Sequence, residues 1–148
     1  MKTVATALAL LFLAVSVSAK GNLPSWYDPG RDAAKDLEAA KNLAGEKKIL
    51  MIVGGGWCRW CHDLEAFLED QEQLREELSD VFLVLKVYRG KENMNDKFLS
   101  GYPQPNGYPF FYILDNRGNL LGTQETGVLE SDDSYDKKSF SEFIDRWK

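Results

Sequence analysis

The stretch that decides the fold runs from Ile49 to His62 and reads ILMIVGGGWCRWCH. Its first five residues, Ile49 to Val53, are apolar and mostly branched, which is typical of a short buried strand. Three glycines follow, and after them stand both cysteines of the chain, Cys58 and Cys61, and its single histidine. The pattern predicts a strand that turns into a helix whose first turn carries two thiols.

The spacing of Cys58 and Cys61 suits a disulfide. Residues three apart share one face of a helix, and their Cα atoms then lie within the range of about 4.4–6.8 Å that a disulfide requires. A bridge that closes so small a loop restricts the unfolded chain very little, so it adds little stability. We therefore interpret the pair as a reactive dithiol.

The expected position of Cys58, at the start of a helix, favours its thiolate. Unpaired backbone N–H groups and the helix dipole stabilise negative charge there, and the neighbouring Arg59 is a permanent cation. A thiolate is the nucleophile in disulfide exchange. We predict that Cys58 attacks a substrate disulfide and that Cys61 resolves the mixed disulfide. This chemistry needs no cofactor, because the electrons pass through the two sulfurs.

Three neighbours of the dithiol have two possible roles each. His62 follows Cys58 by four residues and could lower the pKa of that thiol from the next turn, or it could simply face solvent. Trp57 and Trp60 could be buried against the sheet, or they could form an apolar rim for protein substrates.

The amino-terminal segment predicts export. Lys2 supplies a positive start, residues 5–15 are apolar, and Val17-Ser18-Ala19 fits a small-residue cleavage site. We expect a signal peptide over residues 1–19, cleaved after Ala19, and one domain over residues 20–148 that is periplasmic or secreted. The alternative is an uncleaved anchor, for which the uncharged run is slightly short.

The negative net charge of the chain argues against one class of partner, the nucleic acids. The chain carries a net charge of −5, and removal of Lys2 makes it more negative by one. A nucleic-acid partner would require a basic face, so we expect none. No second long apolar run exists, so we expect no stable membrane insertion after cleavage. We expect a monomer whose partners are protein thiols and disulfides, including a redox partner protein.

Alternating patterns predict an α/β domain. Helices are expected over residues 31–44, 58–70 with a kinked extension to 78, 92–99, and from a capping box at Ser139 onward. Strands are expected over residues 48–53, 81–87, 109–114 and 119–123, the last two joined by a turn. Asp28-Pro29 is the predicted cap of the first helix, and Gly45 its end. This order predicts a small mixed sheet of about four strands with helices on both faces.

An apolar strand followed by Trp-Cys-x-x-Cys at a helix start resembles the thioredoxin superfamily. The resemblance covers most of the domain and is closest to the exported thioredoxin-like group related to the C-terminal domain of bacterial thiol:disulfide interchange proteins. The residues that carry it are Asp36 to Lys41, Lys47 to Leu50, Trp57 to Cys61, Phe67 to Asp70 and Val81 to Val87. It implies a thioredoxin-like fold and a thiol:disulfide oxidoreductase, more a reductase than an oxidase.

The segment Gly107-Tyr108-Pro109 is similar to the cis-proline loop of this superfamily. The resemblance implies a cis bond before Pro109, which would face the dithiol, and a substrate contact for Tyr108. Two positions depart from the family pattern. Ile52 stands where many members carry a buried acid that handles the proton of the second cysteine, and Phe110 stands where threonine is usual. Lys86 matches a strand lysine of the family, although a solvent-facing role is equally compatible with its position.

Other interpretations remain open at this point. Cys58, Cys61 and His62 also match the pattern for covalent haem attachment, with Met51 or Met94 as a second iron ligand. The buried strand before the motif and the alternating elements after it speak against haem. A zinc site would lack ligands. A thioredoxin-fold binding protein that no longer turns over is a further alternative.

Overall fold

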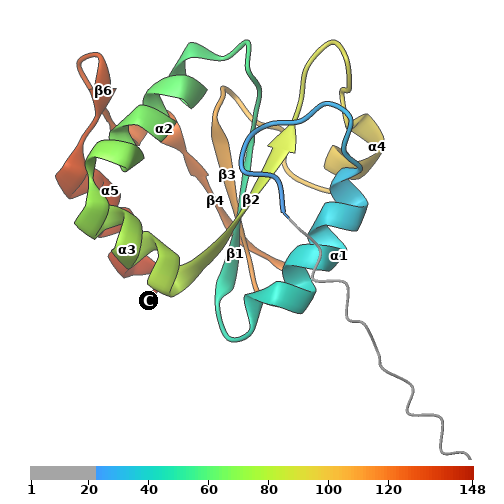
Figure 1. Ribbon diagram of the computed structural model, residues 1–148, viewed down its shortest axis with the longest axis horizontal. Helices are drawn as coiled ribbons and strands as arrows, with labels where there is room; N and C mark the ends of the chain where they lie inside the picture. Colours follow the sequence, from blue (N-terminus) through green and yellow to red (C-terminus); the bar gives the residue numbers. More distant parts are fainter. Residues whose placement is uncertain (1–22) are drawn as a thin grey trace, which may run out of the picture.

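The computed structural model describes residues 23–148, so the expected signal peptide lies outside the described residues. A four-stranded mixed sheet runs through the middle of the domain (Figure 1). Its strands, in the order β2-β1-β3-β4, are β2 Phe82–Tyr88, β1 Lys48–Gly54, β3 Phe110–Leu114 and β4 Leu120–Glu125. β1 pairs with β2 in parallel and with β3 antiparallel, and β3 pairs with β4 antiparallel. The predicted sheet is confirmed.

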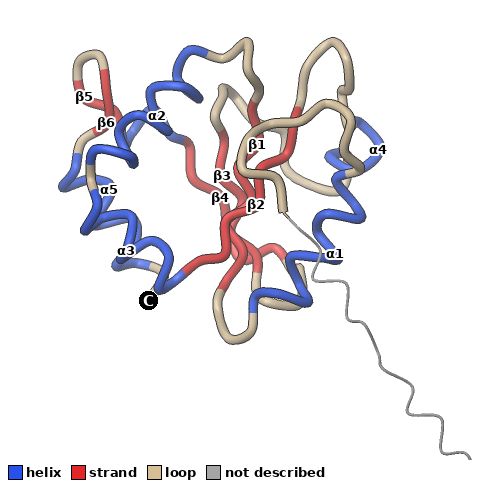
Figure 2. Tube along the Cα trace, in the orientation of Figure 1, coloured by secondary structure: helices blue, strands red, loops and turns tan. Residues whose placement is uncertain are grey.

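Helices cover both faces of the sheet (Figure 2). One face carries α1 Ala33–Ala44 and the one-turn helix α4 Asp96–Leu99, and we call it the α1 face. The other carries α2 Arg59–Asp70, α3 Glu72–Val81 and α5 Lys137–Arg146, and we call it the α2 face. Between β4 and α5 the chain forms the 3₁₀ turn η1 Thr126–Leu129 and a small hairpin of β5 Glu130–Ser131 and β6 Ser134–Tyr135.

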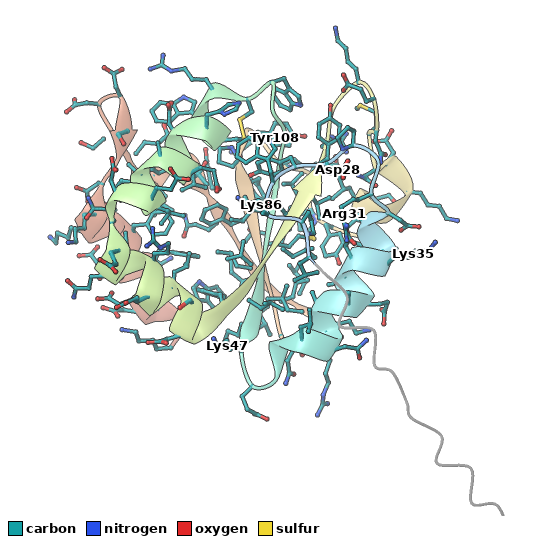
Figure 3. All side chains as sticks on the ribbon, in the orientation of Figure 1. Asp28, Arg31, Lys35, Lys47, Lys86 and Tyr108 are labelled. Carbon is teal, nitrogen blue, oxygen red and sulfur yellow. A yellow bond between two sulfur atoms is a disulfide. The ribbon has the colours of Figure 1, made fainter. Side chains whose placement is uncertain are left out.

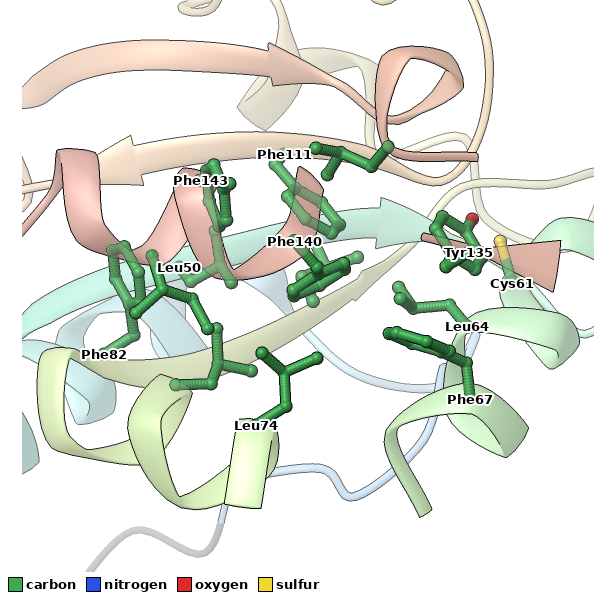
Figure 4. Close-up of a cluster of buried hydrophobic side chains, with 14 of the residues drawn as sticks. Leu50, Cys61, Leu64, Phe67, Leu74, Phe82, Phe111, Tyr135, Phe140 and Phe143 are labelled. Carbon is green, nitrogen blue, oxygen red and sulfur yellow. The ribbon is translucent and has the colours of Figure 1, made fainter. Parts of the chain in front are cut away.

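β1 is buried from Ile49 onward because both faces of the sheet are covered. Its side chains alternate between two cores. Leu50 and Ile52 belong to the cluster on the α2 face, whereas Ile49, Met51 and Val53 belong to the cluster on the α1 face. The α2 face is rich in aromatic rings, and its core extends up to Cys61 (Figure 4). The dithiol is thus anchored directly on the core.

The first helix starts later than the sequence predicts. The predicted cap at Asp28-Pro29 is wrong, because the Asp28 carboxylate accepts a hydrogen bond from the Gly30 N–H within a turn. Asp32 is the N-cap instead, and its side chain accepts from the N–H groups of Ala34 and Lys35. Gly45 ends the helix with a φ of 59°, as predicted.

Two further predictions of helix boundaries are wrong. The last helix begins at Lys137, since the Asp136 side chain accepts from the Ser139 N–H at 2.6 Å, so Ser139 lies in the first turn and is no cap. The helix expected over residues 92–99 is reduced to α4. Gly90 and Asn93 form an isolated bridge instead, and Asn95 adopts a left-handed conformation with φ 49°. The predicted break near Gln71 is confirmed, since it separates α2 from α3.

Candidate functional site

The dithiol lies where β1 passes into α2, and two of the three glycines there, Gly54 and Gly55, make this passage possible. A Cβ atom on Gly54 would lie 2.5 Å from the Cys61 sulfur, and a Cβ on Gly55 would collide with the Trp57 indole. Real Cβ contacts do not approach so closely, so the cysteine sulfur and the indole can sit against the backbone only where no side chain intervenes. The absence of side chains at these glycines therefore lets the dithiol pack against the end of the strand.

Cys58 and Cys61 form a disulfide with their Cα atoms 5.2 Å apart. Cys58 is the N-cap of α2, and its sulfur accepts a hydrogen bond from the Cys61 N–H at 3.2 Å. The predicted position of Cys58 at the helix start is confirmed. Cys61 is fully buried, while Cys58 keeps 5% of its surface exposed. When the bridge opens, the backbone N–H and the helix dipole favour a thiolate at Cys58.

Arg59 and His62, which flank the dithiol in the sequence, make different contacts. The exposed Arg59 guanidinium lies 3.4 Å from the Asp63 carboxylate and 3.8 Å from that of Asp133, so two carboxylates offset its charge. The His62 ring forms a hydrogen bond of 2.8 Å with the Gly56 carbonyl and packs on Trp26. His62 therefore braces the glycine turn, and its role in tuning Cys58 stays a prediction.

The two tryptophans of the motif have different environments. Trp57 is 56% exposed, and its indole N–H donates to the Arg89 carbonyl at 2.8 Å. Trp60 is partly buried and packs edge-on against Tyr135, whose hydroxyl donates to the Trp60 carbonyl. Of the two roles left open by the sequence, the exposure of Trp57 is compatible with the apolar rim, whereas Trp60 packs against the core.

The cis-proline loop lies beside the dithiol loop. The Tyr108–Pro109 peptide bond is cis, as the resemblance implied. The Tyr108 ring, labelled in Figure 3, contacts the Trp57 ring edge-on at 5.4 Å between centroids. The Pro109 carbonyl accepts from the Thr126 hydroxyl at 2.7 Å, which ties the loop to η1. The fold thus brings Tyr108, and with it the cis peptide bond at Pro109, next to Trp57, the residue that precedes Cys58.

A pocket of about 590 Å³ opens next to Trp57. It is lined mainly by aromatic and small residues, among them Tyr27, Trp57, Tyr88 and Gly90. The Tyr88 hydroxyl donates to the Glu92 carboxylate at its edge, and this hydrogen bond lowers the pKa of Glu92. Such an apolar hollow beside a disulfide can accept a side chain of a bound polypeptide.

Behind the dithiol, Lys86 occupies the position next to Ile52 in the sheet register. Its ammonium lies 2.5 Å from the Glu65 carboxylate and donates to the Ser25 carbonyl. It also lies over the Trp26 and Tyr27 rings. The solvent-facing alternative for Lys86 is therefore wrong, because the residue is buried by the amino-terminal loop and α2.

Sequence reasoning missed Glu65 and Tyr27. Glu65 follows Cys61 by four residues, so helical spacing could have placed it near the dithiol. Tyr27 comes from an irregular segment far from the motif, and no local pattern marks it. Its hydroxyl is buried with no hydrogen-bond partner among residues 23–148. Burial raises the pKa of Tyr27 well above its ordinary value, and the Glu65 carboxylate adds to the rise.

The described residues contain no cluster of three or more His, Cys, Asp and Glu side chains that could hold a metal ion. The haem alternative requires both sulfurs to bond a porphyrin and His62 to bind iron. Here the sulfurs bond each other, and the His62 ring contacts the Gly56 carbonyl. This arrangement favours the dithiol interpretation. Within residues 23–148 no helix is long and apolar enough to cross a membrane.

The comparison with solved structures bears on the fold of the chain. No family model and no curated protein matches the sequence. Among solved structures, the chain is similar to a disulphide isomerase from Xylella fastidiosa Temecula1, with a TM-score of 0.67 and 24% identity over 84% of this chain and 96% of that one. A thioredoxin-fold protein from Helicobacter pylori matches with a TM-score of 0.46 and 12% identity, over 70% and 83% of the two chains.

Sheet order, the dithiol at the start of α2 and the cis proline before β3 together define the class of protein. The chain has the thioredoxin fold, as the sequence predicted.

Proposed function

We propose that this chain is an exported thiol:disulfide oxidoreductase that exchanges disulfides with protein substrates. The observation that carries the proposal is the Cys58–Cys61 disulfide at the amino end of α2, in which Cys58 caps the helix and Cys61 is fully buried. This asymmetry suits a nucleophile and a resolving thiol. The disulphide isomerase of similar fold is consistent with the same class of reaction.

The reaction follows from the two sulfurs alone. The Cys58 thiolate attacks one sulfur of a substrate disulfide, and the other substrate sulfur leaves as a thiolate. Cys61 then attacks the Cys58 sulfur, which closes the disulfide and releases the second substrate thiol. Two electrons pass from the dithiol to the substrate, and a redox partner protein must return them. Trp57, Tyr108 and Pro109 would hold the substrate polypeptide at this point.

The proposal includes export and a reducing direction. Export rests on the sequence of residues 1–19 and would place the dithiol in an oxidising compartment. The reducing direction rests on the resemblance to thiol:disulfide interchange proteins. Near Cys58, the Cys61 N–H donates to its sulfur, and the Arg59 guanidinium lies close to the carboxylates of Asp63 and Asp133.

Two measurements test the proposal. In the first, purified protein with a thiol reductant should speed the reduction of insulin disulfides, and Cys58→Ser should lose this activity. If Cys58→Ser keeps the biological role of the protein, the redox-inactive binding protein is the better description. In the second, glutathione titration should give a reduction potential close to that of thioredoxin, about −270 mV. A potential near that of strong oxidants, about −120 mV, would overturn the reducing direction.

A further inference from the structure

We infer that Tyr27 is the hydrogen-bond donor that activates Cys61, the resolving thiol. The inference rests on the proposed function and names a residue that neither the motif nor the cis-proline loop contains. It starts from the one feature of the site that disulfide exchange at Cys58 leaves unexplained, a buried tyrosine hydroxyl with no partner among residues 23–148.

The hydroxyl of Tyr27 and the sulfur of Cys61 both lie close to Gly54. A Cβ atom on Gly54 would lie 2.5 Å from the Cys61 sulfur and 3.2 Å from the Tyr27 hydroxyl oxygen. Tyr27 is 4% exposed and Cys61 is fully buried, so in the disulfide form water has little access to either group. The Tyr27 hydroxyl is therefore a polar group beside the buried sulfur.

The state of the sulfur explains why the hydroxyl has no partner here. A disulfide sulfur is a weak acceptor, whereas a thiolate accepts strong, charge-assisted hydrogen bonds. Leaving a buried donor without an acceptor destabilises the folded protein. In the oxidised protein the Tyr27 O–H therefore has no acceptor. When the disulfide opens, the Cys61 thiolate becomes available as one.

Cys61 has a particular need for such a donor. Its thiolate must form in a buried place, which burial opposes. Ile52, which belongs to the same buried cluster as Cys61, is apolar and offers no group that could take up the proton. Lys86, the nearest buried cation in the described residues, is already engaged with Glu65 and the Ser25 carbonyl.

The step balances without a further reactant. In the mixed disulfide, Cys61 gives up its proton to solvent, and the Tyr27 O–H stabilises the thiolate that remains. The thiolate attacks the Cys58 sulfur, so that the Cys58–Cys61 bond forms and the bond from Cys58 to the partner breaks. The partner leaves as a thiolate and takes up a proton. Tyr27 keeps its own proton throughout.

The test separates the two cysteines in time. Fully reduced protein is mixed with excess Ellman's reagent, an aromatic disulfide that gives a coloured thiolate at each displacement. Attack by Cys58 gives a first phase whose rate depends on reagent concentration. Attack by Cys61 on the resulting mixed disulfide gives a second phase that does not.

We expect Tyr27→Phe to slow the second phase about tenfold, as the loss of one hydrogen bond to a charged group implies. The first phase should stay within about twofold of wild type. The pH at which the second phase reaches half its maximal rate should rise in Tyr27→Phe. Glu65, Lys86 and Tyr135, the other titratable groups around Tyr27, are present in both proteins and cannot cause this difference.

Tyr112→Phe is the matched control. Tyr112 is equally buried, lies on the α1 face and donates its hydroxyl to the Pro103 carbonyl, so its loss should change neither phase. A second phase of wild-type rate in Tyr27→Phe would overturn the inference, as would equal slowing of both phases. If wild-type Cys58 itself reacts no faster than a free thiol, the proposed function fails, and that result is visible in the first phase alone.

Discussion

The two faces of the sheet differ in whether their buried polar groups have hydrogen-bond partners. On the α1 face the buried polar groups are paired: Tyr112 donates to the Pro103 carbonyl, and the Asp36 carboxylate accepts from Arg31. On the α2 face, Tyr27 and Trp147 each bury a polar atom that finds no hydrogen-bond partner among residues 23–148. The dithiol lies at the edge of this second face. The comparison teaches that the buried polar side chains Tyr112 and Asp36 of the α1 face have partners, whereas the α2 face leaves the Tyr27 hydroxyl, close to Cys61 at Gly54, without one.

The largest expected effect comes from filling the space between the sheet and the dithiol. In Gly54→Ala the new methyl group would meet the Cys61 sulfur at 2.5 Å and the Tyr27 ring at 3.1 Å. We expect a loss of about 3 kcal/mol in the free energy of unfolding, as for a strongly overpacked core, measured by urea denaturation of the oxidised protein.

Gly101→Ala is the control for that substitution. Its methyl group would lie 3.7 Å from the Phe98 carbonyl, an ordinary contact, so stability should change by about 0.5 kcal/mol or less. Equal effects of the two substitutions would show that the dithiol does not rest against Gly54.

The second effect concerns substrate binding at the edge of the α2 face. Trp57→Ala removes an exposed ring that contacts Tyr108 and lines the pocket beside the dithiol. For a protein disulfide substrate we expect the KM to rise about tenfold, equivalent to about 1.4 kcal/mol, with a smaller change in kcat. Leu121→Ala, which changes another exposed apolar residue, on β4, should leave both constants unchanged. A KM insensitive to Trp57 would remove this residue from the substrate surface.

The third effect compares the faces directly. Tyr112→Phe should lower the free energy of unfolding of the oxidised protein by about 1 kcal/mol, because a satisfied buried hydrogen bond is lost. Tyr27→Phe should leave it unchanged or raise it, because the hydroxyl that disappears had no partner. Thermal or urea denaturation of both variants measures the difference. A loss at Tyr27 as large as that at Tyr112 would erase the contrast between the faces.

The smallest effect lies at the start of α5. Hydrogen bonds from Ser139 lower the pKa of the Asp136 carboxyl. A lowered pKa means that the ionised carboxylate stabilises the folded state above the ordinary Asp pKa of about 3.9, and that this contribution is lost as the pH falls through the lowered value. Asp136→Ala should therefore lower the melting temperature by a few degrees at neutral pH and by less at low pH. Ser139→Ala should lower the melting temperature less than Asp136→Ala at neutral pH. A larger loss for Ser139→Ala would instead support Ser139 as the cap, as the sequence predicted.

Local patterns predicted most of the fold, and they failed where two acceptors compete. The apolar run at Ile49 to Val53, the helical stripe through Phe140 and Ile144, and the stop at Gly45 each reflect one strong preference, and each prediction is confirmed. The caps were predicted wrongly because Asp28 and Ser139 carry the same kinds of acceptor as Asp32 and Asp136. Only the three-dimensional path of the chain selects between such neighbours.

The candidate site likewise contains residues that the sequence predicted and residues that it could not. The spacing of Cys58 and Cys61 defines the dithiol in the sequence, and the resemblance supplied the cis bond at Pro109. Tyr27 could not be predicted from the sequence, because it lies in an irregular segment that only the fold places near Cys61. Lys86 was ambiguous, because strand alternation alone does not reveal that the amino-terminal loop covers it.

The asymmetry of the two sulfurs is the central claim, and trapping tests it most directly. Two reduced single-cysteine variants, Cys61→Ser and Cys58→Ser, are incubated with oxidised glutathione at neutral pH, and the glutathione adduct is followed by mass spectrometry. The account predicts that Cys58, alone in Cys61→Ser, forms a lasting mixed disulfide rapidly, while the buried Cys61, alone in Cys58→Ser, reacts at least about tenfold more slowly. Equal rates, or faster modification of Cys61, would contradict it.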